Sequence, residues 1–271
     1  MTLHGLACIE SYNEAEAIFI EGLKRGEGSS AYALGNLYYK NDNMPNNIEK
    51  AILLYEKASE LKNAKALSKM ANFYYNGDSV EKNLEKSFTY SLLAVLNGDV
   101  ESLVTLGDDY YDGIGTSVNL KKAFKCYEEA LQEEQYIAAI RLAEMYYYGK
   151  YVKQSKALAY DYYKIGVKSG DAPSASLAFF CLGKMRFYGE GIEQDYATAV
   201  DFFRSSIVAD DLGLAHLFLG KCYIHGYGVD VDLNEGYKEL LLASERGEVD
   251  SDENLLDELV IDMDGIVSFK N

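Results

Sequence analysis

The sequence predicts an all-α solenoid built from one helix–turn–helix repeat that recurs about six times along its 271 residues. Three observations carry this prediction. A small residue recurs at a nearly fixed spacing, a glycine follows it by six positions in five repeats, and a helix-capping residue follows it by twelve. We number each repeat from its small residue, which is position 0. The six small residues are separated by 36, 36, 36, 40 and 37 positions: Gly35, Ala71, Gly107, Ala143, Gly183 and Gly220.

The first helix of each repeat contains position 0. Leu or Met stands at −1, Ser or Ala at −5 and, in five repeats, Tyr at +3, which places these positions on one packed stripe. The small residue lets the neighbouring helix approach closely. Glycine at +6 predicts a left-handed cap that ends the helix, and the first repeat has Asn41 there. The glycines are Gly77, Gly113, Gly149, Gly189 and Gly226.

The second helix of each repeat begins after a capping residue at +12. Positions +16, +20 and +23 then form its buried stripe, which mostly reads small, aromatic, small. This pattern is typical of closely spaced helices whose gap is filled by a ring. The six capping residues are Asn47, Asn83, Asn119, Ser155, Asp195 and Asp232.

The two ends of the chain extend the same register. Upstream, it predicts a cap at Ser11 and a buried stripe at Ala15, Phe19 and Gly22, so residues 11–26 are expected to form a half repeat. Six repeats then occupy residues 29–251. Residues 252–271 are expected to form an acidic capping helix, 252–263, and a tail that closes the stack with a polar face. The whole chain, 1–271, is thus expected to be a single repeat domain.

This pattern resembles the Sel-1-like repeats, which are relatives of the tetratricopeptide repeats. The resemblance rests on residues such as Ala138, Leu142, Ala143, Tyr146 and Gly149, and it covers roughly residues 11 to 263. It implies a right-handed α/α superhelical solenoid that acts as an adaptor or scaffold. Family members serve in protein degradation complexes, cell-envelope processes and host–pathogen contacts. Some are secreted with one disulfide per repeat, but this chain lacks such paired cysteines.

Composition narrows the possible partners. Acidic residues outnumber basic ones by 43 to 26, giving a net charge of −17. Nucleic acid and anionic membranes are therefore poor partners, because phosphate binding needs clustered Lys and Arg. A basic protein partner is electrostatically favoured, although the charge alone also explains solubility. Eight acids and no bases lie between Glu248 and Asp264.

Cellular location is predicted from what the sequence does not contain. The four cysteines have no regular spacing, which favours buried free thiols in a reducing compartment. The first residues lack the basic start and apolar core of a signal peptide, and no apolar stretch is long enough to span a membrane. We therefore expect a cytoplasmic protein.

A partner is expected on the concave face, formed by first-helix positions opposite the packed stripe, namely −3, +1, +4 and +5. Position +4 forms a nearly continuous aromatic ladder, and tyrosine is enriched at interfaces. Position +1 changes from amides to acids to lysines along the chain. The alternative is that the +4 tyrosines pack against the next repeat. The predicted binding residues are Asn36, Tyr39, Asn72, Tyr75, Asp108, Tyr111, Glu144, Tyr147, Tyr148, Lys184, Phe187, Tyr188 and Lys221.

The 40-residue step places four extra residues around 169–174, between the fourth and fifth repeats. Two interpretations are open. The insertion is a kink that reshapes the groove where the charge switches from Glu144 to Lys184, or it is a surface insertion without consequence. The sequence favours the second.

Three motifs resemble parts of catalytic or metal-binding sites, but each lacks the other residues that such a site needs. Ser59–Lys62 and Ser79–Lys82 both match SxxK, but the SDN and KTG elements of β-lactamases are missing. Residues 230–241 start like a calcium loop but lack its glycine and final Glu. Cys222 and His225 are too few for a metal site, and a buried thiol and a surface imidazole explain them better.

The sequence therefore predicts a protein–protein interaction module without catalytic activity, cofactor or metal. The leading hypothesis is an adaptor that binds a protein or peptide in its groove. An acidic inhibitor or immunity protein that neutralises a basic enzyme or toxin is the alternative, and an enzyme is the least favoured.

Overall fold

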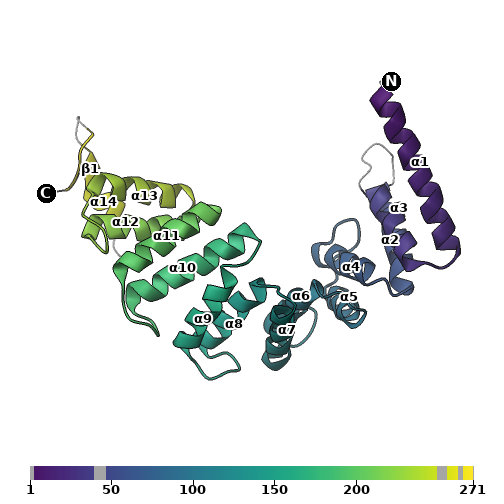
Figure 1. Ribbon diagram of the computed structural model, residues 1–271, viewed down its shortest axis with the longest axis horizontal. Helices are drawn as coiled ribbons and strands as arrows, with labels where there is room; N and C mark the ends of the chain where they lie inside the picture. The colour runs from purple at the N-terminus through teal and green to yellow at the C-terminus, as the bar shows by residue number, and fades with distance from the viewer. Residues whose placement is uncertain (1–2, 40–46, 249–254, 262–264, 271) are drawn as a thin grey trace. The chain divides into compact units, whose positions relative to one another are not determined.

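The computed structural model describes residues 3–39, 47–248, 255–261 and 265–270. These residues form an all-α helical repeat fold (Figure 1). The helices are α1 Leu3–Lys24, α2 Gly28–Tyr39, α3 Asn47–Glu60, α4 Ala64–Asn76, α5 Leu84–Leu96, α6 Ser102–Asp112, α7 Leu120–Gln132, α8 Ile137–Tyr148, α9 Lys156–Gly166, α10 Ala172–Tyr188, α11 Tyr196–Asp210, α12 Gly213–His225, α13 Leu233–Glu245 and α14 Leu255–Glu258. A short hairpin of β1, Leu259–Ile261, and β2, Val267–Phe269, follows.

The chain divides into two compact parts, residues 1–130 and 131–271. In each part the two helices of a repeat lie side by side; Figure 1 shows α10 beside α11 and α12 beside α13. The even-numbered helices α2 to α12 are the first helices of the six repeats, and α3 to α13 are the second. The expectation of one continuous repeat domain stays a prediction.

The predicted helix ends are confirmed in the residues described. The five glycines at +6 all adopt left-handed backbone at the ends of α4, α6, α8, α10 and α12. The caps at +12 accept a hydrogen bond from the backbone N–H three residues on: Asn83, Asn119, Ser155, Asp195 and Asp232. Asn47 opens α3, while Asn41 lies outside the described residues.

The packing of position 0 against the ring at +20 explains why a small residue is needed. A Cβ on Gly35 would lie 2.7 Å from Cε1 of Tyr55, and on Gly107 it would lie 2.4 Å from Cε1 of Tyr127. Both rings are almost fully buried. The two helices of a repeat are therefore held at a distance set by the ring.

A second close approach joins successive repeats. A Cβ on Gly115, at +8 of the third repeat, would lie 1.9 Å from the carbonyl oxygen of Leu84 at the start of α5. Gly115 also has a left-handed backbone, with φ of 65°. Ser79 occupies +8 in the second repeat and adopts the same conformation, with φ of 60°, although it carries a side chain.

The four-residue insertion lengthens the first helix of the fifth repeat. Asp171 caps α10, its carboxylate accepting from the N–H of Ser174, and Pro173 lies in the first turn. Four residues are close to one helical turn, so the stripe on this 17-residue helix keeps its register. Ser176 and Ser206 join the added turn to α11, each hydroxyl donating to the other residue's carbonyl oxygen at 2.9 Å. The insertion is an extra helical turn, not a surface loop.

Both chain ends differ from the prediction. Helix α1 begins at Leu3, so the expected start at Ser11 is wrong. Residues 3–10 contain no proline, and a capping residue does not by itself stop a helix that can continue. Gly22 does mark a close approach, since a Cβ there would lie 2.1 Å from the hydroxyl oxygen of Ser30.

At the other end, the expected acidic helix over 252–263 is wrong. Among the described residues of this stretch, the four of α14 are helical, and the chain then forms a hairpin that pairs Leu259 with Phe269 and Ile261 with Val267. The run Leu-Val-Ile favours a strand. Leu255, Leu259 and Val267 are buried against Leu217, Ile224 and Leu240, so the hairpin closes the hydrophobic core of the last repeat. Residues 249–254 and 262–264, which hold many of the acids, lie outside the described residues.

Candidate protein-interaction face

The predicted binding residues all lie on the first helices of the six repeats, at positions +1, +4 and +5. The structure assigns these three positions different environments. Position +1 faces the ring at +20 in two repeats, position +4 packs against the next repeat in several, and position +5 carries the most exposed tyrosines.

At +1, two side chains are engaged by the buried ring of their own repeat. The hydroxyl of Tyr55 donates to Oδ1 of Asn36 at 2.9 Å, and that of Tyr127 donates to Oδ1 of Asp108 at 2.7 Å. A buried phenol needs such a partner. In these repeats the side chain at +1 therefore accepts the hydrogen bond of the buried tyrosine hydroxyl. The sequence did not predict this role. Asn72, by contrast, is exposed, and its repeat has Ser91 in place of the ring.

The charged +1 residues of the later repeats are half-buried. Glu144 forms an ion pair with Arg141 at 3.5 Å on α8. The ammonium group of Lys221 lies 5.8 Å from the ring centroid of Phe218 on α12. Lys184 lies between them in sequence, on α10. The side chains at +1 in residues 131–271 are thus an acid followed by two bases, all half-buried.

Position +4 is largely committed to packing. Phe187 is 8% exposed and contacts Phe218 of the next repeat, with ring centroids 5.5 Å apart. The expectation that Phe187 offers its ring to a partner is therefore wrong. Ile224, which continues the ladder, is buried in the core beneath the hairpin.

Tyr147 is also held by the next repeat. Its hydroxyl donates to the carboxylate of Glu190, which pairs with Lys156 at 2.8 Å. Burial and the hydrogen bond to this carboxylate raise the pKa of Tyr147. For Glu190, burial opposes ionisation, but the hydrogen bonds from Lys156 and Tyr147 hold its pKa below the ordinary value.

The +4 tyrosines of the first two repeats are more accessible. Tyr39 is 38% and Tyr75 is 44% exposed, while Tyr111 is half-buried. Tyr39 nevertheless reaches the second repeat, where the Lys69 ammonium lies 4.6 Å from its ring centroid. Some rings of the aromatic ladder are thus exposed at the surface, while others pack against the next repeat.

Position +5 presents two tyrosines in successive repeats, Tyr148 and Tyr188, which we call the exposed tyrosine pair. They are 63% and 53% exposed. Each stands edge-on to the packed ring before it, with centroid separations of 4.8 Å for Tyr147 and Tyr148 and 5.0 Å for Phe187 and Tyr188. The packed +4 ring therefore supports the exposed +5 ring in the same way twice.

The side chains one turn before the exposed tyrosine pair are charged. Residues four apart share a helix face, so Glu144 accompanies Tyr148 and Lys184 accompanies Tyr188. Such a surface combines aromatic contact area with charges of both signs. It is suited to recognising a protein chain.

The structure offers little that resembles a catalytic or metal centre. Among the described residues, no group of three or more His, Cys, Asp or Glu side chains is placed to hold a metal ion. Burial raises the pKa of the Cys126 and Cys181 thiols to about 11 and that of Cys222 to about 12, which keeps them protonated at neutral pH. Cys222 is buried and His225 is exposed, as predicted.

His216 was not singled out as a buried residue by the sequence analysis. It lies in α12 with Nε2 2.7 Å from Asp211, and its other ring nitrogen contacts Glu239. Its partners lie 5 and 23 positions away in sequence, so a repeat pattern gives no signal for them.

Paired helices in register, with an exposed aromatic surface on the first helix, define an α-helical repeat protein of the kind that contacts other proteins. The model of the Sel1 repeat matches residues 28–63, 64–99, 101–133, 137–171, 180–207 and 213–248. The chain belongs to the Sel1 repeat family, whose members are generally non-catalytic modules that mediate protein–protein interaction. The unmatched residues between the fourth and fifth repeats, 172–179, include the extra turn of α10.

Solved structures share the fold. One is a protective antigen of uropathogenic Escherichia coli with the SLR fold, at 21% identity and a TM-score of 0.77; the match covers 86% of this chain and 49% of that one. This chain thus spans about half the length of that antigen. Another is a Sel1 repeat protein from Oxalobacter formigenes, at 22% identity and a TM-score of 0.69, covering 79% of this chain and 84% of that one. None of the curated proteins matches this sequence.

The length and apolar character of the helices bear on whether one of them could span a membrane. Throughout the described part of the chain, no helix combines the length and the apolar character needed to cross a bilayer.

Proposed function

We propose that this chain is an adaptor that binds a partner protein or peptide on its first-helix face, centred on Tyr148 and Tyr188. The observation that carries the proposal is the repeated support of an exposed ring by a packed one in two successive repeats. A ring that is already held loses little conformational entropy when a partner covers it. Tyrosine also keeps a hydroxyl for hydrogen bonding at the rim of such a contact.

The charges beside the rings favour a partner segment whose own charges follow a particular order. Glu144 comes first along the chain, and Lys184 and Lys221 follow it. A segment with a basic residue followed by acidic ones would match this order, and the reverse order would place like charges together. Within residues 1–130, Tyr39 and Tyr75 are separately accessible at position +4 of α2 and α4.

A second candidate function is an acidic inhibitor or immunity protein that neutralises a basic enzyme or toxin. The net charge of −17 supports it. Electrostatic steering would then set the association rate, and that rate would fall steeply with added salt. An adaptor that binds through tyrosine rings would respond weakly to salt.

Capture of partners from the source cell tests the proposal, comparing the unmodified chain with a Tyr148→Ala/Tyr188→Ala variant at low and high salt. The adaptor proposal expects specific partners to disappear with the double variant at both salt concentrations. A Leu158→Ala/Val208→Ala variant is the control, since it shortens exposed apolar side chains of α9 and α11. Partners that are lost with salt but not with the tyrosine variant would favour the inhibitor instead.

A further inference from the structure

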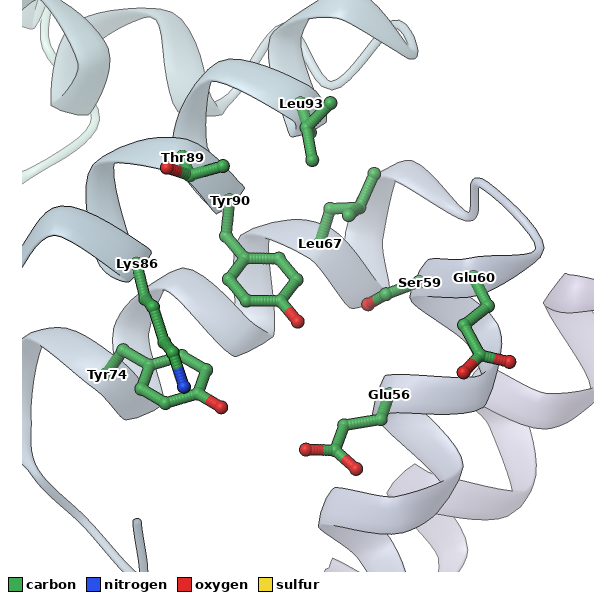
Figure 2. Close-up of a pocket in the computed structure, with 9 residues that line it drawn as sticks. All are labelled: Glu56, Ser59, Glu60, Leu67, Tyr74, Lys86, Thr89, Tyr90 and Leu93. Carbon is green, nitrogen blue, oxygen red and sulfur yellow. The ribbon is translucent and has the colours of Figure 1, made fainter. Parts of the chain in front are cut away.

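A pocket of about 480 Å³ opens between α3, α4 and α5, away from the face discussed above. Figure 2 shows aromatic side chains of α4 and α5 on one side and two carboxylates of α3 on the other. Leu67 and Tyr74 line it from α4, at positions −4 and +3. These positions are about 140° and 160° around the helix from Asn72 at +1. The pocket is therefore separate from the proposed adaptor face.

The aromatic wall is a stacked pair. The rings of Tyr74 and Tyr90 are nearly parallel, with centroids 5.6 Å apart and planes inclined by 10°. The ammonium group of Lys86 lies 4.9 Å from the centroid of Tyr74. A cation thus already lies over the ring of Tyr74, and the ring of Tyr90 lines the pocket beside it (Figure 2).

The opposite wall is acidic. Glu56 and Glu60 lie one turn apart on α3, so both carboxylates belong to one helix face. Glu56 has no ion-pair partner among the residues that the structure describes. Glu60 pairs with Lys57 at 2.8 Å, but both side chains are more than half exposed, and such surface pairs exchange readily. Burial, the neighbouring Tyr74 and these two carboxylates raise the pKa of Tyr90, so the pocket disfavours further negative charge.

A buried acceptor completes the lining. The hydroxyl oxygen of Ser59 is shielded from solvent and, within the described part of the chain, has no hydrogen-bond partner. Buried polar atoms are normally paired, so this oxygen is suited to accept a hydrogen bond from a ligand. The pocket thus offers two carboxylates, one hydroxyl acceptor and the flat face of a ring.

We propose that this pocket binds the guanidinium group of an arginine side chain from a partner protein. A guanidinium group is planar and always charged, has five N–H donors, and stacks on aromatic faces. It would lie on the ring of Tyr90 and donate to Glu56, Glu60 and Ser59. A lysine ammonium group has the charge but lacks the plane and the fork of donors. The proposal does not depend on the adaptor face.

The test titrates the full chain with the blocked peptide acetyl-Ala-Arg-Ala-amide and follows the backbone amide NMR signals of α3 and α5. We expect signals of residues 56–60 and 86–93 to shift, and the lysine peptide to bind at least about threefold more weakly. Free arginine should also bind more weakly, because its carboxylate faces the acidic wall. Equal binding of the lysine peptide, or shifts elsewhere in the chain, would overturn the proposal.

Two double variants distinguish binding in the pocket from non-specific electrostatic attraction to the acidic chain. Glu56→Gln/Glu60→Gln should weaken binding of the arginine peptide at least about tenfold, because charge-assisted hydrogen bonds are lost. Glu128→Gln/Glu129→Gln removes the same charge from exposed sites on α7 and should leave the affinity unchanged. Tyr90→Leu should weaken binding about two- to fivefold through the lost stacking. Equal effects of the two glutamate variants would contradict a specific site.

Discussion

A Cβ atom on Gly107 would lie 2.4 Å from Cε1 of Tyr127, which is too close for two carbon atoms that are not bonded. The ring of Tyr127 fills the space that the missing side chain leaves, and its hydroxyl reaches past to Asp108. The spacing between the two helices of a repeat is thus fixed by one glycine and one tyrosine.

Gly107→Ala should therefore destabilise the protein by about 1 to 2 kcal/mol, even though alanine favours a helix more than glycine does. Urea unfolding measures the change. Gly170→Ala is the control, because a Cβ there meets nothing within 4 Å and the backbone is not left-handed. In a Tyr127→Ser background, which resembles the natural pair Ala71 and Ser91, Gly107→Ala should cost less. An equal cost in both backgrounds would show that ring contact is not the cause.

Ser206→Ala should destabilise the extra turn of α10. It removes the hydroxyl that bonds the carbonyl oxygen of Ser176 as a second donor beside the helical N–H, at a cost of about 1 kcal/mol. Amide hydrogen exchange of residues 172–179 should accelerate. Ser205→Ala, one position away, removes a bond to its own helix and should have a smaller effect. If the two variants unfold alike, the reciprocal serine pair is not what anchors this turn.

Ser79→Gly should stabilise the protein by about 0.5 to 1 kcal/mol, since it relieves a left-handed backbone at a residue with a side chain. The reverse change, Gly115→Ser, should be strongly destabilising because of the 1.9 Å approach to the carbonyl oxygen of Leu84. Thermal unfolding measures both. A loss of stability in Ser79→Gly would mean that its side chain makes a contact worth more than the strain.

Asp109 occupies position +2 of the third repeat, where the fourth and fifth repeats have Met145 and Met185. Its side chain is buried, and Oδ2 has no hydrogen-bond partner among the described residues. Burial raises its pKa from 3.8 to about 6, against the hydrogen bond from Ser91. Because the folded-state pKa is raised, the folded protein binds the proton more tightly, and stability falls as pH rises from about 4 through 6.

Asp109→Asn removes this titration and should stabilise the protein at pH 7 by about 1 to 3 kcal/mol. The advantage over the unmodified chain should shrink as the pH falls below 6 and vanish near pH 4. Chemical unfolding at several pH values gives the difference directly. If the difference in unfolding free energy does not vary with pH, the change in packing causes it and the charge of Asp109 does not.

The sequence predicted most of the fold because the repeat presents each signal five or six times. Position 0, the glycine at +6 and the cap at +12 are local, and each recurs with the same spacing. The errors lie where the repetition stops. Helix α1 extends beyond Ser11, and the strand-forming run at Leu259 to Ile261 interrupts the expected closing helix. The insertion was correctly located, but its conformation depends on the pairing of Ser176 with Ser206, which are 30 residues apart.

The candidate site was less predictable, because helical geometry places a residue on a face but not against a particular neighbour. Tyr147 and Tyr148 differ by one position, yet the first bonds Glu190 of the next repeat and the second is 63% exposed. Such a contact depends on how far one repeat is displaced from the next. The binding face therefore stays a prediction, while the structure distinguishes the packed +4 rings from the exposed +5 rings.

The affinity of a captured partner for the Tyr148→Ala/Tyr188→Ala variant tests the adaptor proposal most directly. The partner is titrated against the folded unmodified chain, this variant and the Leu158→Ala/Val208→Ala control, with circular dichroism confirming equal helix content. Interface tyrosines often contribute 2 kcal/mol or more, so we predict that the double variant weakens binding at least about 100-fold and the control less than about threefold. Unchanged affinity in the folded tyrosine variant would contradict the proposal.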